Sequence, residues 1–261
     1  MTSSNNKNNE QECLHESWMN LQHAELRELE QAAAANRPKD EQKQTQLIEK
    51  IIKHFQDYCT NRSRLAQKDV SPFFAPTSCT PLENSVLWIC GCRPSSFIRL
   101  IFTLFCGVEI ESYITQFLQG ITRNGEIHEF TAKQMNMVDE LQSKTIREER
   151  KLSSRLASLQ EEIVDQPLFS KTKKKIEGDN DDDGGGGVDC ENADEPLDKY
   201  NKYMAAIMEE ADELRMKTLK EIVVILEPDQ AVEYLAAAKK IRLCIQQWGK
   251  KRDHDNTNSC N

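Results

Sequence analysis

The sequence predicts an all-α protein, a multi-helix bundle of about seven or eight helices. Its 261 residues include only ten glycines and eight prolines, too few for the many turns of a β-sandwich or barrel. Apolar residues recur at steps of three to five along most of the chain, which is the spacing of amphipathic helices. This length allows one or two domains with a substantial core.

Two amphipathic helices are expected at the N-terminal end. Residues 1–11 are strongly polar and are expected to be disordered. A helix is then expected over 13–35, where Trp18 and Leu21 lie on the apolar face. After a polar break, a second helix is expected to end near Asp69, because two prolines follow closely.

A capping box predicts the start of the next helix. Thr80 can accept a hydrogen bond at the N-terminus, and Glu83 stands three residues later. This helix is expected to continue to about Ile89, before Gly91 interrupts it. A very apolar helix is expected over 95–106, and the two segments should be the most buried part of the protein.

The middle of the chain predicts one long charged helix. A shorter helix is expected first, over 109–118, and the Asn124-Gly125 pair predicts a turn. Thr131 and Gln134 form a second capping box. The charged helix that begins there is expected to run about 35 residues, to Asp165.

An acidic, glycine-rich stretch separates the last two helices from the rest. Residues 170–195 include four consecutive glycines and many acidic residues, so they cannot bury enough apolar surface to order themselves. We expect a flexible linker there. Helices are expected over 196–226 and 229–248, and a disordered tail over 253–261.

No reaction can be argued from this sequence. It lacks nucleotide-binding loops, hydrolase nucleophile motifs and helical zinc-binding histidine pairs. The five histidines are scattered, and the nine cysteines form no Cys-x-x-Cys pair. We therefore predict that the protein is not an enzyme and has no catalytic residues, metal site or cofactor.

Charge and hydropathy limit the partners and the compartment. The net charge of −9 does not favour nucleic acid, so no direct sequence-specific DNA binding is expected. The N-terminus lacks a signal-peptide pattern, and the longest uncharged apolar stretch, 100–108, is too short to cross a membrane. We expect no membrane association and a location in the nucleus, the cytoplasm or both, and Lys171–Lys175 is a candidate nuclear-import patch.

The last helix combines apolar anchors with basic residues. Ile241, Ile245 and Trp248 lie among lysines and arginines, the form that calmodulin targets take. The alternative, which we favour, is that Ile245 and Trp248 pack into the bundle while the basic residues face water.

Two arginines are attached to the most apolar part of the chain. Because a buried unpaired charge is very costly, Arg93 and Arg99 must each reach a carboxylate, a helix C-terminus or water. Glu148 and Glu149 on the long helix are the candidate partners. We expect these arginines to fix helix register, with contact to a ligand or partner as the alternative.

Several segments resemble the plant Delay of Germination domain. Residues 88–94 read Trp-Ile-Cys-Gly-Cys-Arg-Pro and match the Trp-Ile-x-Gly-x-(Arg/Lys)-Pro pattern of that family. Arg147-Glu-Glu-Arg150 on the long helix matches a second recurring pattern, in the same order. The resemblance also includes the Trp18 helix and residues 54–70, and it extends over 12–252.

The resemblance implies a plant regulator rather than a DNA-reading factor. The same domain forms the C-terminal part of the TGA class of basic-leucine-zipper transcription factors. This chain has no basic region or zipper ahead of Trp18, so it resembles the stand-alone members, which include seed-dormancy and abscisic-acid or salt-response regulators. Some relatives bind haem through C-terminal histidines, but this chain offers only His254 there, and haem is not expected.

We therefore expect a non-enzymatic protein that acts through protein–protein contacts in abscisic-acid signalling, seed dormancy and germination, or the salt-stress response. The implied partners are signalling proteins, such as protein phosphatases or leucine-zipper factors, and a homodimer is a further candidate. The alternative is a transcription regulator that associates with DNA directly or through basic-leucine-zipper partners. The candidate partner-binding residues are Trp18, Leu21, Arg93, Arg99, Ile241, Ile245 and Trp248.

Overall fold

The computed structural model describes residues 2–34, 40–105, 130–165 and 194–259, and within these ranges it contains α-helices and no strand. The predicted all-α class is therefore confirmed. The helix expected over 109–118, the turn at Asn124-Gly125 and nearly all of the expected linker lie outside the described residues. The helices are α1 (Thr2–Ala34), α2 (Glu41–Ala66), α3 (Ser71–Phe74), α4 (Pro81–Ser85), α5 (Pro94–Phe105), α7 (Ala132–Asp165), α9 (Asp194–Ile225) and α10 (Pro228–Ser259).

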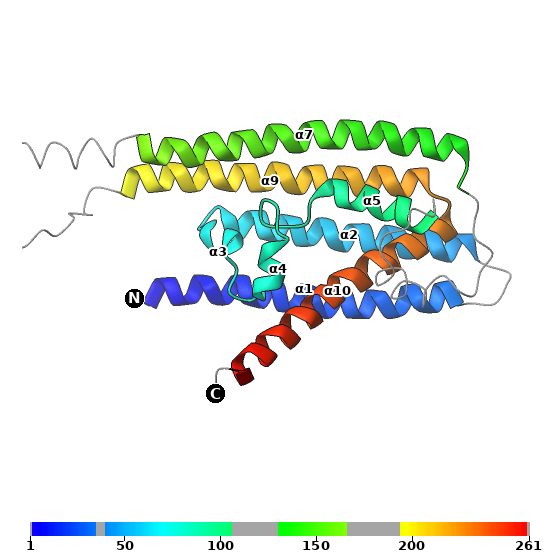
Figure 1. Ribbon diagram of the computed structural model, residues 1–261, viewed down its shortest axis with the longest axis horizontal. Helices are drawn as coiled ribbons and strands as arrows, with labels where there is room; N and C mark the ends of the chain where they lie inside the picture. The colour runs from blue at the N-terminus through cyan, green and yellow to red at the C-terminus, as the bar shows by residue number, and fades with distance from the viewer. Residues whose placement is uncertain (1, 35–39, 106–129, 166–193, 260–261) are drawn as a thin grey trace, which may run out of the picture.

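The long helices form an elongated bundle. Helices α7 and α9 lie side by side along its length, and α9 also packs on α2 (Figure 1). Helix α2 packs on α1, and α10 crosses both obliquely before its C-terminal end leaves the bundle (Figure 1). The short helix α5 packs against α7, α9 and α10, and the short helix α4 packs against α10. None of the described helices is long and apolar enough to cross a membrane.

Both predicted capping boxes are present. The Glu83 amide donates to Thr80 Oγ1 over 3.2 Å, and the Thr80 amide donates to Glu83 Oε2 over 2.9 Å. At the start of α7, the Gln134 amide donates to Thr131 Oγ1 and the Thr131 amide donates to Gln134 Oε1. Each box satisfies backbone donors that have no partner inside the helix, which fixes where the helix begins.

The core consists of two apolar clusters. The larger one joins α1, α2, α5, α7, α9 and α10, and Leu29, Ile98, Ile101 and Ile222 are fully buried in it. The smaller one lies where α2, α3, α7 and α9 meet, around Met208. Full burial of one such side chain contributes about 1.5–3 kcal/mol relative to its exposure, so these clusters hold the bundle together.

Both ends of the chain contain more helix than expected. Helix α1 begins at Thr2 rather than at Cys13, and α10 continues to Ser259 rather than ending at Trp248. The helices therefore extend into the two ranges for which disorder was expected, 1–11 and 253–261. No proline or glycine interrupts residues 2–34, and only Gly249 stands in the last helix, so neither helix meets a residue that must end it.

The helix that begins at Pro81 is shorter than predicted. It ends at Ser85, and Ile89 and Cys90 adopt positive φ angles of 44° and 60°, which a helix cannot contain. The chain turns there instead. Helix α3 was also not predicted, because a four-residue helix has no periodicity to detect.

Gly249 permits a close approach between α10 and the start of α4. A Cβ atom at Gly249 would lie 2.0 Å from Thr80 Oγ1 and 2.7 Å from Thr80 Cβ. Alanine favours helices over glycine by about 1 kcal/mol, yet we expect Gly249→Ala to lower the free energy of unfolding by about 1–3 kcal/mol because of this overlap. Urea unfolding measures it. The neighbouring exposed Gln247→Ala is the control, and a stabilised Gly249→Ala protein would contradict the packing.

Candidate functional site

Residues Trp88 to Pro94, which carry the family-like motif, form a tight turn between α4 and α5. The Trp88 amide donates to the Gly91 carbonyl over 2.7 Å, and the Gly91 amide donates back to the Trp88 carbonyl over 3.2 Å. Within the turn, a Cβ atom added to Gly91 would lie 2.8 Å from the guanidinium carbon of Arg215. The motif therefore needs glycine where a buried arginine packs against its backbone.

Arg215 on α9 donates hydrogen bonds to the buried side of this turn. Its side chain is almost fully buried and donates to three carbonyls, those of Trp88, Ile89 and Cys92. Arg215 Nη1 also donates to Asp212 Oδ1 over 2.6 Å. Each nitrogen of the guanidinium thus donates to an acceptor, which compensates for the removal of its charge from water.

A second buried arginine reaches the same turn from α2. Arg62 Nη2 donates to the Cys90 carbonyl over 2.9 Å, and Arg62 Nε lies 3.4 Å from Asp212 Oδ2. Burial disfavours the charge of Arg62, but Asp212, Tyr58 and the nearby thiols together outweigh burial and raise the pKa of the guanidinium. We call Arg62, Asp212 and Arg215 the arginine clamp.

The thiols beside the clamp are not reactive nucleophiles. Burial raises the pKa of Cys59 and of Cys90 to about 12, with the nearby Asp212 adding to the effect at both. Since the thiolate is the nucleophilic form, both thiols stay protonated at neutral pH.

Glu149 on α7 holds the other side of the motif. It is buried and accepts from Arg93 Nε over 2.7 Å, from the Ser95 amide over 2.6 Å and from Ser95 Oγ over 3.1 Å. The indole of Trp88 also donates to Ser153 on α7 over 2.9 Å. The predicted pairing of Arg93 with Glu149 is therefore confirmed.

Among the described residues, Arg99 pairs with neither of its candidate partners, Glu148 and Glu149, and the expectation that it fixes helix register is wrong. Its side chain is exposed, and the other expected partner, Glu148, is bonded by Lys151 over 2.8 Å. Helix α5 buries the face that carries Ile98 and Ile101, and Arg99 lies on the opposite side of the helix. Arg99 cannot fix the register of α5 from that position.

Trp18 packs against aromatic side chains of α2. The Trp18 ring stacks on Tyr58 with centroids 4.2 Å apart and on Phe55 at 5.8 Å. The Lys239 ammonium lies 5.9 Å from the Trp18 ring. Leu21 is half-buried on the same helix.

The three anchors of the last helix differ in exposure. Ile241 is half-buried and packs against the larger core cluster, and Ile245 is half-buried as well. Trp248 is 49% exposed. Packing into the bundle is therefore observed for Ile241, whereas Trp248 presents much of its ring to the surface.

Two of the basic residues on α10 are used inside the bundle. Lys239 is buried and donates to Gln22 Oε1 over 3.0 Å and to the buried carboxylate of Glu25. Arg242 Nη1 donates to Glu83 Oε1 over 2.7 Å. These bonds attach α10 to α1 and α4, so only part of its basic charge faces outward.

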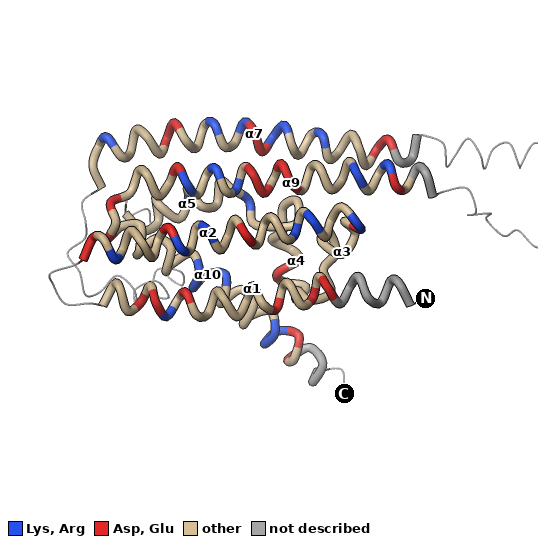
Figure 2. Tube along the Cα trace, turned by 180° about the vertical axis from the view of Figure 1, so that it is seen from behind, with Lys and Arg blue, Asp and Glu red and all other residues tan. Residues whose placement is uncertain are grey.

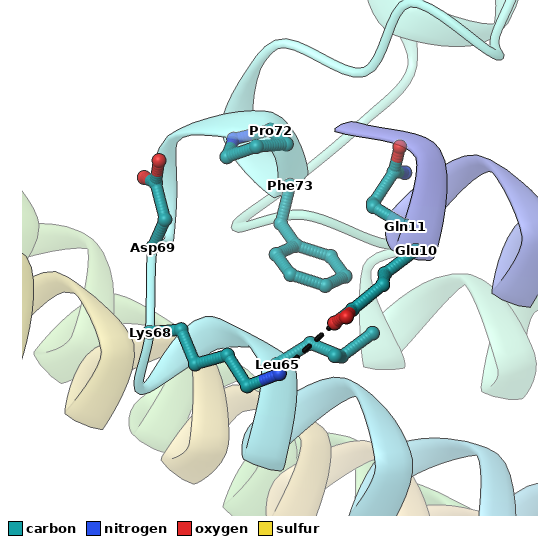
Figure 3. A pocket seen from close by; sticks show the side chains of 7 residues that line it. All are labelled: Glu10, Gln11, Leu65, Lys68, Asp69, Pro72 and Phe73. Carbon is teal, nitrogen blue, oxygen red and sulfur yellow. Dashed lines mark hydrogen bonds and ion pairs between the residues drawn. The ribbon is translucent and has the colours of Figure 1, made fainter. Parts of the chain in front are cut away.

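A small hollow lies where α1, α2 and α3 meet. Phe73 forms its floor, and an ion pair of 3.0 Å between Lys68 and Glu10 crosses one side (Figure 3). The space holds about one water molecule. It cannot accommodate an organic substrate.

The arginine clamp predicts that an arginine-to-lysine substitution lowers the free energy of unfolding far more at Arg215 than at the surface. Lysine cannot reproduce the fork of donors that Arg215 offers to three carbonyls and Asp212, so Arg215→Lys should cost about 3–5 kcal/mol of unfolding free energy. Arg155→Lys is the control, because Arg155 pairs with Glu210 at the surface and should lose less than about 1 kcal/mol. Equal losses in urea unfolding would contradict the clamp.

Comparison with known proteins agrees with the motif. A family described as seed dormancy control matches residues 25–103, which include α2 and the motif turn. Protein DOG1-like 3 of Arabidopsis thaliana is 38% identical over 247 residues, which cover 92% of this chain and 84% of that protein.

Two further relatives are more distant. Protein RESPONSE TO ABA AND SALT 1 of Arabidopsis thaliana is 26% identical over 209 residues, which cover 79% of this chain and 78% of that protein. Transcription factor TGA2.3 of Oryza sativa is 27% identical over 104 residues, 40% of this chain and 30% of that protein. With the extent of the first match, the helical fold and the Trp88–Pro94 motif, the chain belongs to the DOG1 family of plant seed-dormancy regulators.

Proposed function

We propose that this protein regulates abscisic-acid signalling, and with it seed dormancy, germination or the salt-stress response, by binding signalling proteins rather than by catalysis. Similarity over nearly the whole chain to a DOG1-like protein carries the proposal. The name of the relative that responds to ABA and salt supports the hormone context. The motif turn supports a binding role, because the clamp uses its backbone carbonyls for structure and the Cys90 thiol beside the clamp is not an activated nucleophile.

The exposed end of α10 is the surface that fits a partner best. Trp248 is half exposed there, and Lys250, Lys251 and Arg252 follow it with exposed side chains. This end projects from the bundle, whereas positive and negative charges alternate along α7 and α9 (Figure 2). A tryptophan beside three basic residues suits a partner with an acidic rim around an apolar pocket.

Among the partner classes that the resemblance implies, we favour a protein phosphatase of abscisic-acid signalling. Calmodulin would have to enclose Ile241 and Ile245 together with Trp248, and Ile241 is packed against the core. Binding of that kind requires α10 to leave the bundle and to break the bonds of Lys239 and Arg242. A partner that contacts only the exposed end of α10 avoids this cost.

A paired substitution tests the surface. Trp248→Ala should weaken binding to the phosphatase by about tenfold or more, because exposed tryptophans are frequent hot spots of interfaces. Val224→Ala is the matched control, since Val224 on α9 is even more exposed, at 80%, but lies on another element. Isothermal titration calorimetry measures the binding, and germination of overexpressing seeds across abscisic-acid concentrations measures the effect in the plant.

The outcomes separate the surface from the function. If Trp248→Ala loses phosphatase binding and the effect on germination while Val224→Ala keeps them, the surface and the function are both supported. If Trp248→Ala binds and acts like the wild-type protein, the surface is wrong. If wild-type overexpression leaves the response to abscisic acid and salt unchanged, the proposed function is wrong.

The second candidate function is transcriptional regulation. The relative TGA2.3 is a transcription factor, and its match covers 40% of this chain. The acidic net charge of −9 opposes direct binding to a phosphate backbone, so we favour an association through a leucine-zipper partner in this case.

A titration with duplex DNA tests this candidate. The purified protein should bind no tighter than about 1 µM at physiological salt and without sequence preference, because its net charge of −9 opposes binding to the phosphate backbone. A gel-shift assay with a leucine-zipper relative on the same duplex is the positive control. Sequence-selective binding below about 1 µM by this chain alone would overturn the partner-only mechanism.

A further inference from the structure

Three potential metal ligands meet where α1, α4 and α10 come together. His15 lies on α1, Cys79 precedes the capping box, and Glu83 belongs to it. One ligand atom from each lies within 4.8 Å of the other two. His15 Nε2 and Cys79 Sγ are 3.6 Å apart.

This spacing suits a tetrahedral zinc ion. With Zn–S of about 2.3 Å and Zn–N of about 2.0–2.1 Å, the sulfur and nitrogen of a tetrahedral site lie about 3.6 Å apart. The observed separation of 3.6 Å between His15 Nε2 and Cys79 Sγ matches this distance. Glu83 needs only a small movement, because its oxygen is already within 4.8 Å of both.

The surroundings act on the three ligands differently. Burial, and then the charge of Arg242, lower the pKa of His15, whereas burial, and then the charge of Glu83, raise the pKa of the Cys79 thiol, so zinc has to displace the thiol proton. Glu83 accepts from Arg242 on one oxygen and from the Thr80 amide and hydroxyl on the other. These bonds orient the carboxylate as outer partners do in zinc sites, and they leave one lone pair of Oε1 unused.

We propose that His15, Cys79 and Glu83 form a zinc-binding site with a fourth position open to water. The site lies beside the contact of Gly249 with Thr80, and it goes beyond the proposed function because a metal ion is its ligand. On binding, the Zn–S bond replaces the S–H bond of Cys79, and the proton leaves to solvent. Cys79 is partly exposed, which gives the ion a path to the site.

Zinc at this position links segments far apart in the sequence. It bonds α1 to the segment before α4, and Arg242 attaches that same Glu83 to α10. Arg242 also repels a cation, so we expect affinity well below that of a four-ligand structural site, with a Kd on the order of 1 µM. Bound zinc should raise the melting temperature.

The test uses the full chain, reduced and freed of metal, with zinc chloride as the probe. Competition against a chromophoric zinc chelator should give one ion per chain. Cys79→Ser and His15→Ala should each weaken binding by about tenfold or more. The matched controls are Cys13→Ser and His23→Ala, because these residues are exposed on the same helix and should leave the affinity unchanged.

Cobalt substitution reports directly on the thiolate. The wild-type protein with Co²⁺ should show a sulfur-to-cobalt charge-transfer band that Cys79→Ser loses and Cys13→Ser keeps. Circular dichroism confirms that each variant is folded. The proposal is overturned if no stoichiometric zinc binds at about 10 µM protein, if Cys79→Ser binds as tightly as Cys13→Ser, or if the cobalt band is absent.

Discussion

The buried guanidinium of Arg215 is the group on which the arrangement of the other helices depends. The turn that begins at Trp88 directs three carbonyl groups into the interior, where each would be costly without a donor. Arg215 on α9 supplies those donors, and Asp212 neutralises its charge. With Arg62 on α2, one ionic cluster places the turn against α2 and α9 together.

The start of α4 also positions the last helix, α10. Thr80 and Glu83 cap α4 and are also the residues that α10 contacts, through Gly249 and Arg242. A capping box is a local feature, yet here its carboxylate also receives a distant arginine. The position of α10 therefore depends on α4, a helix of five residues. The sequence pattern predicted a longer helix there, to about Ile89.

How well each feature could be predicted follows from the range of the interactions that create it. Capping boxes join residues three apart, and both were predicted correctly. The pairing of Arg93 with Glu149 was also predicted, because an arginine near an apolar segment must find a carboxylate. Arg99 satisfies the same rule by exposure to solvent. This could not be predicted, because the apolar residues on both sides of Arg99 do not indicate which face of α5 is buried. The clamp could not be predicted, because the acceptors of Arg215 are backbone carbonyls more than 120 residues earlier.

The structure divides α10 into two parts with different physical roles. Its first turns, from Ala231 to Ala237, are buried almost throughout, so they belong to the core. Its last turns carry Trp248 and the basic residues outside the bundle. Because Gly249 packs on Thr80 directly after Trp248 and Arg242 donates to Glu83, the capping box of α4 anchors α10 next to the turns that leave the bundle.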